Sequence, residues 1–213
     1  MSGDQEASQT TDTASRPNVL FISIDDLNDW TGFLGGHPQA LTPHMDRLAK
    51  KSVVFNRAYS PAQSCNPSRT ALLTGIRPSS SGVYHNGQTM RASPVLESCV
   101  TLPGYFKQEG YHVLGSGKIF HGSDAVSWNE YWPSLKNTIP SSQWPDNAPK
   151  PLQGTRSLTW GPVDMKKEET SEWKVADWVA KQLKRDFKKP FFLGCGFLRP
   201  HLPWHAPRSY FEK

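Results

Sequence analysis

The chain has 213 residues, of which 36% are hydrophobic and 20% charged, so it can build a folded core and is not disordered as a whole. Three cysteines exclude a disulfide scaffold, and the absence of any apolar run of about eighteen residues excludes a membrane-spanning helix. The formal net charge of +5 favours anionic ligands. The basic residues are dispersed, which argues against a nucleic-acid partner.

Residues 1–16 are mostly Ser, Thr, Gln, Asp and Ala, and they contain no apolar run. We expect a disordered leader here. The segment lacks the basic start and apolar centre of a secretory signal. The protein is therefore cytoplasmic, or a signal was removed before this numbering begins, and the localisation stays open.

The ordered part begins at Pro17, and the run 18–26 is almost unbroken in its apolar character until it reaches two aspartates. Such a run is typical of a strand buried on both faces in a parallel sheet. Further strands are predicted at 53–55, 111–114 and 190–197. Helices are predicted to open at 42 and to span 67–73, 102–108 and 171–187. The alternating order predicts an α/β fold with a mostly parallel central sheet flanked by helices.

Residues 122–170 differ in composition, with four tryptophans, many prolines and little periodicity. We interpret them as a long ordered insertion of the kind that shapes a substrate pocket. A new helix starts at about Ser209, just before the chain stops. We therefore expect residues 17–213 to be the N-terminal part of a larger catalytic domain.

Polar residues follow three of the predicted strands, where ligands bind in open α/β sheets. They are Asp25 and Asp26, then Lys118 and His121, then His201. Two adjacent carboxylates suit Ca²⁺ or Mg²⁺, provided that the chain bends so that both reach one ion. The spacing His201-x-x-x-His205 occurs in zinc helices, but Pro203 makes a continuous helix unfavourable, and we set zinc aside.

The most specific motif is the string from Cys65 to Gly75, Cys-Asn-Pro-Ser-Arg-Thr-Ala-Leu-Leu-Thr-Gly. Its Cys comes just before a predicted helix N-terminus, with Asn66 as the cap, where free N–H groups and the helix dipole favour anions. Arg69 is close enough to reach back. A buried structural thiol and an anion-tuned thiol nucleophile are alternative interpretations. The second is disfavoured because Cys-dependent phosphatases use glycine-rich phosphate loops.

The string Cys-x-Pro-Ser-Arg followed by Leu-Thr-Gly resembles the sulfatase motif, in which the Cys is oxidised to Cα-formylglycine. The resemblance extends over almost the whole ordered chain, through 17–26, 42–49 and 117–121. Leu27-Asn-Asp-Trp30 and Arg199-Pro-His-x-Pro203 are most similar to the iduronate-2-sulfatase-like branch. The resemblance implies the alkaline-phosphatase-like fold.

The resemblance also implies a chemistry. Hydrated formylglycine at position 65 attacks the sulfur of a sulfate ester, the alcohol leaves, and the second hydroxyl of the diol then expels sulfate. A plain Ser or Cys lacks that second hydroxyl and would remain sulfated.

The implied roles fall on seven residues. Asp25, Asp26 and residue 65 would bind Ca²⁺. Arg69 would hold the diol, and Lys118 would contact sulfate or diol oxygens. His121 would accept the proton from the collapsing diol, and His201 would protonate the leaving oxygen.

The implied partners are a sulfated carbohydrate substrate, a formylglycine-generating enzyme and the remaining C-terminal part of the same protein. No membrane partner is expected. Further metal ligands and a second Lys are expected beyond residue 213, so the 213-residue chain alone should turn over little substrate.

Two alternative functions stay open. One is a phosphonate monoester or phosphodiester hydrolase with the same modified Cys, and the other is a non-catalytic glycan-binding fragment that uses the tryptophans.

Overall fold

The computed structural model describes residues 16–133 and 159–212. Its main sheet has four parallel strands in the order β1-β5-β2-β3. The strands are β1 (Val19–Ile24), β2 (His112–Gly117), β3 (Glu130–Trp132) and β5 (Phe191–Phe197). A separate parallel pair joins β4 (Trp160–Val163) to β6 (Trp204–Pro207). The predicted α/β class with a parallel sheet is thus confirmed.

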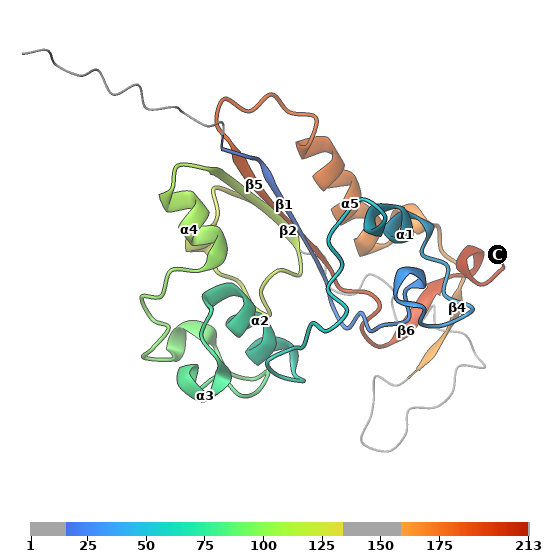
Figure 1. The fold of residues 1–213 in the computed structure, drawn as a ribbon, viewed down its shortest axis with the longest axis horizontal. Helices are drawn as coiled ribbons and strands as arrows, with labels where there is room; N and C mark the ends of the chain where they lie inside the picture. Colours follow the sequence, from blue (N-terminus) through green and yellow to red (C-terminus); the bar gives the residue numbers. More distant parts are fainter. Residues whose placement is uncertain (1–15, 134–158, 213) are drawn as a thin grey trace, which may run out of the picture.

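Helices cover both faces of the main sheet, as Figure 1 shows, with α2 and α4 on one side and α5 on the other. The helices are α1 (Pro43–Ala49), α2 (Cys65–Thr74), α3 (Pro78–Ser81), α4 (Leu102–Gln108) and α5 (Ser171–Gln182). Short 3-10 turns lie at η1 (Gly32–Leu34), η2 (Met90–Ala92), η3 (Ala125–Ser127), η5 (Lys167–Glu169) and η6 (Arg208–Tyr210).

Each face of the sheet has its own apolar core. On the α2 and α4 side, Leu73 and Trp128 pack with Phe192 of β5. On the other side, Val175 and Val179 of α5 pack with Leu193. Strand β5 has a neighbouring strand along each edge and an apolar core against each face, so it is buried along almost its whole length, as its sequence predicts.

The edge strand β1 is less buried than its sequence suggests. Leu20 and Ile22 are 43% and 50% exposed. Among the described residues β1 has a neighbouring strand on one side only. In addition, the side chains of Leu20 and Ile22 point away from the core that contains Val19 and Phe21. The expectation of a strand buried on both faces is therefore wrong for β1. It holds for β5.

Other boundaries also differ from the prediction. Residues 53–55 form no strand, and Val53 and Phe55 are largely exposed. Helix α2 begins at Cys65 itself, with Ser64 as its N-cap, so Asn66 lies inside the first turn. Helix α5 ends at Gln182 rather than near 187.

The segment read as an insertion contributes to the main body of the fold. Within 122–170, β3 adds the last strand to the main sheet and Trp128 fills the core. Residues 134–158, with Trp144, lie outside the described residues, as do residues 1–15 of the expected leader. No helix among the described residues is long and apolar enough to cross a membrane.

Candidate functional site

The carboxyl end of β1 places two aspartates in different environments. Asp25 continues the strand, donating its N–H to the Phe197 carbonyl of β5 at 3.0 Å, and its side chain is buried. Asp26 has a φ of 60°, the left-handed region that non-glycine residues rarely adopt. The chain therefore bends at Asp26, as a shared ligand role requires, but the Asp26 side chain is exposed.

Two cations hold the Asp25 carboxylate. Arg69 Nη2 lies 2.8 Å from Asp25 Oδ1, and Lys118 Nζ contacts Asp25 Oδ2. Burial opposes the ionisation of Asp25, but the hydrogen bonds and charges of Lys118 and Arg69 outweigh it and hold the pKa of this carboxyl below its ordinary value. Asp25 is thus a buried anion balanced by two positive charges.

Arg69 also ties the ends of two strands together. Its Nη1 donates to the carbonyls of Lys118 at 2.6 Å and Ile119 at 2.9 Å, and to Ser23 Oγ at 3.2 Å. Its Nε is buried without a hydrogen-bond partner among the residues that the structure describes. The Arg69 side chain of α2 therefore fixes the carboxyl ends of β1 and β2, and its Nε remains as one unused donor.

Lys118 leaves β2 at a point where only glycine fits. Gly117 has a φ of +77°, and a Cβ on it would lie 1.9 Å from the Gly196 carbonyl oxygen. A Cβ on Gly196 would meet the Lys118 backbone at 2.3 Å. The two strands approach each other closely here, and that approach holds Lys118 in register with Asp25.

Cys65 lies at the first residue of α2, half-buried, with its Sγ 3.9 Å from Asp25 Oδ2. Asp25, Cys65 and His201 form a group in which one potential ligand atom from each lies within 4.8 Å of the others. Asp26 is not part of this group. The structure therefore brings Asp25, Cys65 and His201 together from three separate elements.

The free N–H groups expected at the start of α2 are largely taken. Asn86 Oδ1 accepts the Asn66 N–H at 2.9 Å, Pro67 has no N–H, and the Ser68 N–H bonds to the Ser64 carbonyl. The Asn66 side chain in turn donates to two carbonyls of the loop, those of His85 and Gln88. Loop 85–88 therefore covers part of this helix end, through the bond of Asn86 to the Asn66 N–H and the two bonds of the Asn66 side chain.

His121 and His201 approach the same charges. Burial lowers the pKa of His121, and the positive charges of Lys118 and Arg69 lower it further. His201 lies close enough to contribute to that field. Since a carbonyl only accepts, the 2.7 Å contact between His201 Nδ1 and the Leu202 carbonyl places a proton on Nδ1 and turns Nε2 outward from this bond.

His205 plays no part in this group. It is buried on β6, and its Nε2 shares a hydrogen bond with Thr159 Oγ1 at 2.9 Å. No helix connects it to His201, since residues 204–207 form a strand. His201 and His205 therefore do not form a pair of metal ligands on one helix.

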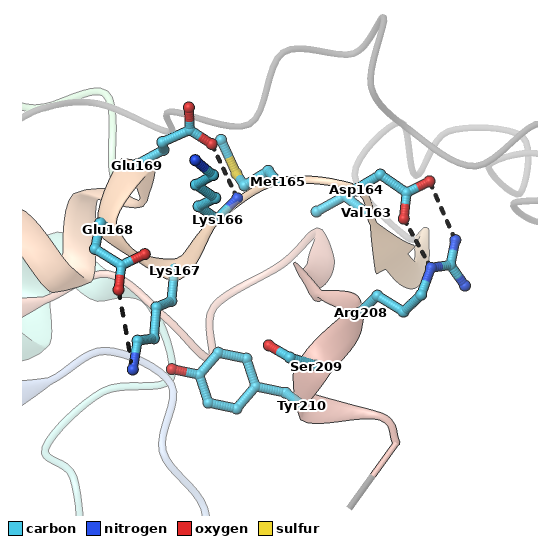
Figure 2. Close-up of a pocket in the computed structure, with 10 residues that line it drawn as sticks. All are labelled: Val163, Asp164, Met165, Lys166, Lys167, Glu168, Glu169, Arg208, Ser209 and Tyr210. Atoms are coloured by element: carbon cyan, nitrogen blue, oxygen red, sulfur yellow. Dashed lines mark hydrogen bonds and ion pairs between the residues drawn. The ribbon is translucent and has the colours of Figure 1, made fainter.

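Two pockets differ in their relation to this site. One, of about 360 Å³, is lined by Arg69 and His121 together with the loops at 86–91 and 120–123. Another, of about 770 Å³, lies between η5 and η6 and is shown in Figure 2. Four of its charged residues form ion pairs with one another, Asp164 with Arg208 and Lys167 with Glu168. The first pocket is the one that adjoins the candidate site.

The sulfatase family model matches residues 17–213. The chain belongs to the sulfatase family. It is 33% identical to a sulfatase of Formosa agariphila over 97% of this chain and 43% of that protein. It is 32% identical to human iduronate 2-sulfatase over 99% of this chain and 39% of that protein. The chain thus spans about two fifths of the length of these relatives.

The fold is also that of solved structures. The phosphonate monoester hydrolase of Agrobacterium radiobacter superposes with a TM-score of 0.73 at 22% identity, covering 92% of this chain and 44% of that chain. At that identity the likeness shows the fold alone. The family match and this likeness agree with the parallel α/β fold of the described residues.

Proposed function

We propose that this chain carries the nucleophile and the anion-binding cations of a sulfatase that hydrolyses sulfate esters of a sugar. The observation that supports this most strongly is the convergence of Cys65, Asp25 and His201 beside Arg69 and Lys118. The family match covers the whole of this cluster. Because the relatives are more than twice as long, the activity is proposed for the protein completed by a corresponding C-terminal part.

Position 65 would be the reacting centre. Converted to formylglycine and hydrated, it supplies a hydroxyl that attacks sulfur and a second hydroxyl that permits release of sulfate. Cys65 is at the start of a helix and only half-buried, so a substrate can approach it. Arg69, one turn along the same helix, keeps a buried Nε donor without a partner among the described residues.

The surrounding charges suit a sulfate. Arg69 and Lys118 place two positive charges against the single negative charge of Asp25, which leaves a net positive field. Such preorganised cations stabilise the negative charge that spreads over sulfate oxygens in the transition state. Lys118 is the compact point charge of the pair, and Arg69 is fixed by three backbone or hydroxyl acceptors.

The two histidines suit opposite proton transfers. A lowered pKa keeps His121 neutral near pH 7, which is the form that accepts a proton from a hydroxyl. His201 already carries a proton on Nδ1, so a second proton on Nε2 makes it an acid for the leaving oxygen. We assign His121 as the base of the release step and His201 as the acid of the attack step.

A calcium ion fits part of this donor set. Asp25 offers carboxylate oxygens beside residue 65, and Asp26 follows at the bend, but Ca²⁺ takes about six to eight oxygen ligands. Asp25, Asp26 and the oxygens of a modified residue 65 would hold it, together with ligands from outside the described residues. When bound, it would supply positive charge that favours the ionised hydroxyl.

The test uses the chain joined to the segment of the Formosa agariphila sulfatase that follows the matched region, produced together with a formylglycine-generating enzyme. We expect hydrolysis of an aryl sulfate with a higher kcat/KM than of an aryl phosphodiester. Cys65→Ala should lower kcat by about 10³-fold or more. An unchanged rate in Cys65→Ala would refute the proposed nucleophile.

The two alternatives make different predictions. A phosphonate monoester or phosphodiester hydrolase would reverse the substrate preference in the same assay. A glycan-binding fragment needs exposed tryptophans. Trp128 is buried in one core and Trp132 packs against the other, but Trp160 is 48% exposed. Binding of a sulfated glycan that survives both Cys65→Ala and Asp25→Asn, with no turnover by the completed protein, would favour that alternative.

A further inference from the structure

Two tryptophans lie side by side on the outer face of the small sheet formed by β4 and β6. The register of this parallel pair sets Trp160 beside Trp204, so both side chains project from the same face. They are 48% and 42% exposed, whereas the next residues, Gly161 and His205, are buried. The alternation along both strands therefore turns one face to solvent and the other to the interior.

A third tryptophan reaches this face from the loop that follows β1. The Trp30 ring lies against the Trp204 ring, with centroids 6.5 Å apart, and against the His37 ring at 5.6 Å. Trp30 is itself 49% exposed. Figure 1 shows the blue loop after β1 beside the pair of β4 and β6. We call Trp30, Trp160 and Trp204 the tryptophan platform.

The loop that carries Trp30 is held in one conformation. The Trp30 N–H donates to Asn28 Oδ1 at 3.0 Å, and the Trp30 carbonyl accepts the His37 N–H at 3.4 Å. Gly36 packs so closely that a Cβ on it would lie 2.5 Å from the Trp30 Cα. A ring that the backbone already positions loses little freedom when a ligand stacks on it.

The platform lies next to the candidate site. Trp204 is the third residue after His201, so their Cα atoms lie within about 11 Å of each other. Trp30 is the fifth residue after Asp25, which limits their Cα separation to about 18 Å. Asp25 and His201 both belong to the group that includes Cys65. A ligand held at residue 65 therefore has the platform within reach of its neighbouring parts.

The chemistry of this face suits a sugar ring. The outward residues of the two strands are Trp160 with Pro162 and Trp204 with Ala206, so the indole rings are its only large side chains. A pyranose ring presents C–H groups on its faces, and the negative π face of an indole attracts them. Beside Trp30, the side chain of Asn28 adds a polar group of the kind that fixes hydroxyl groups in binding sites.

We propose that the tryptophan platform is a subsite for the pyranose ring next to the one that carries the sulfate at residue 65. The proposal rests on the proposed function, which places the sulfated ring at Cys65. It specifies the substrate class as a sulfated oligosaccharide or polysaccharide, in place of a sulfated monosaccharide. Trp204 is the centre of the platform, because Trp160 lies beside it in register and Trp30 lies against its ring.

The binding test records the indole N–H signals of the 213-residue chain by NMR, assigned with single Trp-to-Phe variants. The probes are tetrasaccharides prepared from heparin, ι-carrageenan and ulvan, with inorganic sulfate as the reference anion. At least one tetrasaccharide should shift the signals of Trp30, Trp160 and Trp204 in a saturable manner. Inorganic sulfate should leave these signals unchanged, because it has no ring to stack.

Three variants locate the subsite. Trp204→Ala should raise the Kd of the bound tetrasaccharide at least about tenfold, and Trp204→Phe, which keeps an aromatic ring, should raise it less. The matched control is Trp173→Ala on α5. Trp173 is 40% exposed, but Lys167 Nζ already lies 4.7 Å over its ring, so this variant should keep the parent Kd. Circular dichroism of each variant confirms that the chain is folded.

A kinetic test connects the platform to the reaction. In the completed protein, Trp204→Ala should raise KM for the tetrasaccharide at least about tenfold and change kcat little, because the lost contact is present before and during the reaction. The kcat/KM for the aryl sulfate should stay within about twofold of the parent value, since that substrate has no second ring. An equal loss on both substrates would contradict a subsite for a neighbouring ring.

Three binding results would overturn the proposal. They are the failure of every tetrasaccharide to shift the three signals, shifts confined to other tryptophans, and equal effects of Trp204→Ala and Trp173→Ala. If the signals move when the protein concentration alone is raised, and light scattering shows a dimer, the face belongs to a second copy and the proposal is also overturned. Binding at the platform without turnover by the completed protein would contradict the proposed activity alone, so the two failures are distinguishable.

Discussion

Arg69 Nη2 lies 2.8 Å from Asp25 Oδ1, and both side chains are only 7% exposed. The pair joins the first turns of α2 to the end of β1. Removing one partner of a buried pair leaves an uncompensated charge, which is costly. The stability of the N-terminal fold and the geometry of the candidate site therefore depend on the same contact.

Arg69→Met should lower the free energy of unfolding by about 3 kcal/mol, since Asp25 loses one cation and three acceptors lose their donor. Chemical denaturation followed by circular dichroism measures the change. The matched control is Arg185→Met, which removes an exposed pair with Glu130 and should cost less than about 1 kcal/mol. Equal effects of the two variants would contradict the structural role of Arg69.

The double variant Arg69→Met with Asp25→Asn separates the two contributions. Replacing the carboxylate by a neutral amide removes the uncompensated charge, so the double variant should be more stable than Arg69→Met alone. A double variant that loses the sum of the two single effects would show that the residues act independently.

Gly196→Ala should destabilise the protein by about 3 kcal/mol, because its Cβ would meet the Lys118 backbone at 2.3 Å and force β2 and β5 apart. The control is Gly122→Ala, since no atom lies within 4 Å of a Cβ at that position. Thermal unfolding compares them. If Gly196→Ala unfolds at the same temperature as Gly122→Ala, the close approach is not as described.

The cluster of Glu130, Arg185 and His112 predicts that the free energy of unfolding decreases as the pH falls into the acid range, which is the acid limb of the stability profile. Arg185 donates to Glu130 and holds its pKa below the ordinary 4.5, with His112 adding to the effect. A depressed carboxyl pKa stabilises the fold above the unfolded pKa, and this stabilisation is lost as pH falls through the folded one. Glu130→Gln should flatten that limb in urea unfolding below pH 4.5.

The control for the pH effect is Glu97→Gln, at an exposed position outside this cluster. It should keep the pH profile of the parent protein. A profile that Glu130→Gln leaves unchanged would show that solvent screens the cluster completely.

The sequence predicts which residues come together at the candidate site better than it predicts which residues are exposed. Parallel strands place their carboxyl ends at one edge, so the meeting of Asp25, Lys118 and His201 follows from strand positions alone. The position of Arg69 one turn into α2 follows from helix geometry. These predictions depend on local patterns and on one topological rule.

Other features depend on contacts between distant residues. The Asn66 N–H at the start of α2 is bonded by Asn86, and the Asn66 side chain donates to the Gln88 carbonyl, and no local pattern connects that loop to Cys65. The exposure of Ile22 depends on which strand lies at the edge, and an apolar run does not reveal this. The strand predicted at 53–55 is absent, because this segment has no partner strand among the described residues.

The proposed activity requires that Cys65 is converted to the formylglycine aldehyde, which reacts as its hydrate. Mass spectrometry of the proteolytic peptide that spans Cys65, from protein produced with a formylglycine-generating enzyme, tests it most directly. We predict a peptide in which the thiol sulfur is replaced by an aldehyde oxygen and which reacts with a hydrazide. A peptide that keeps an intact thiol, in a sample that hydrolyses the aryl sulfate, would contradict the account.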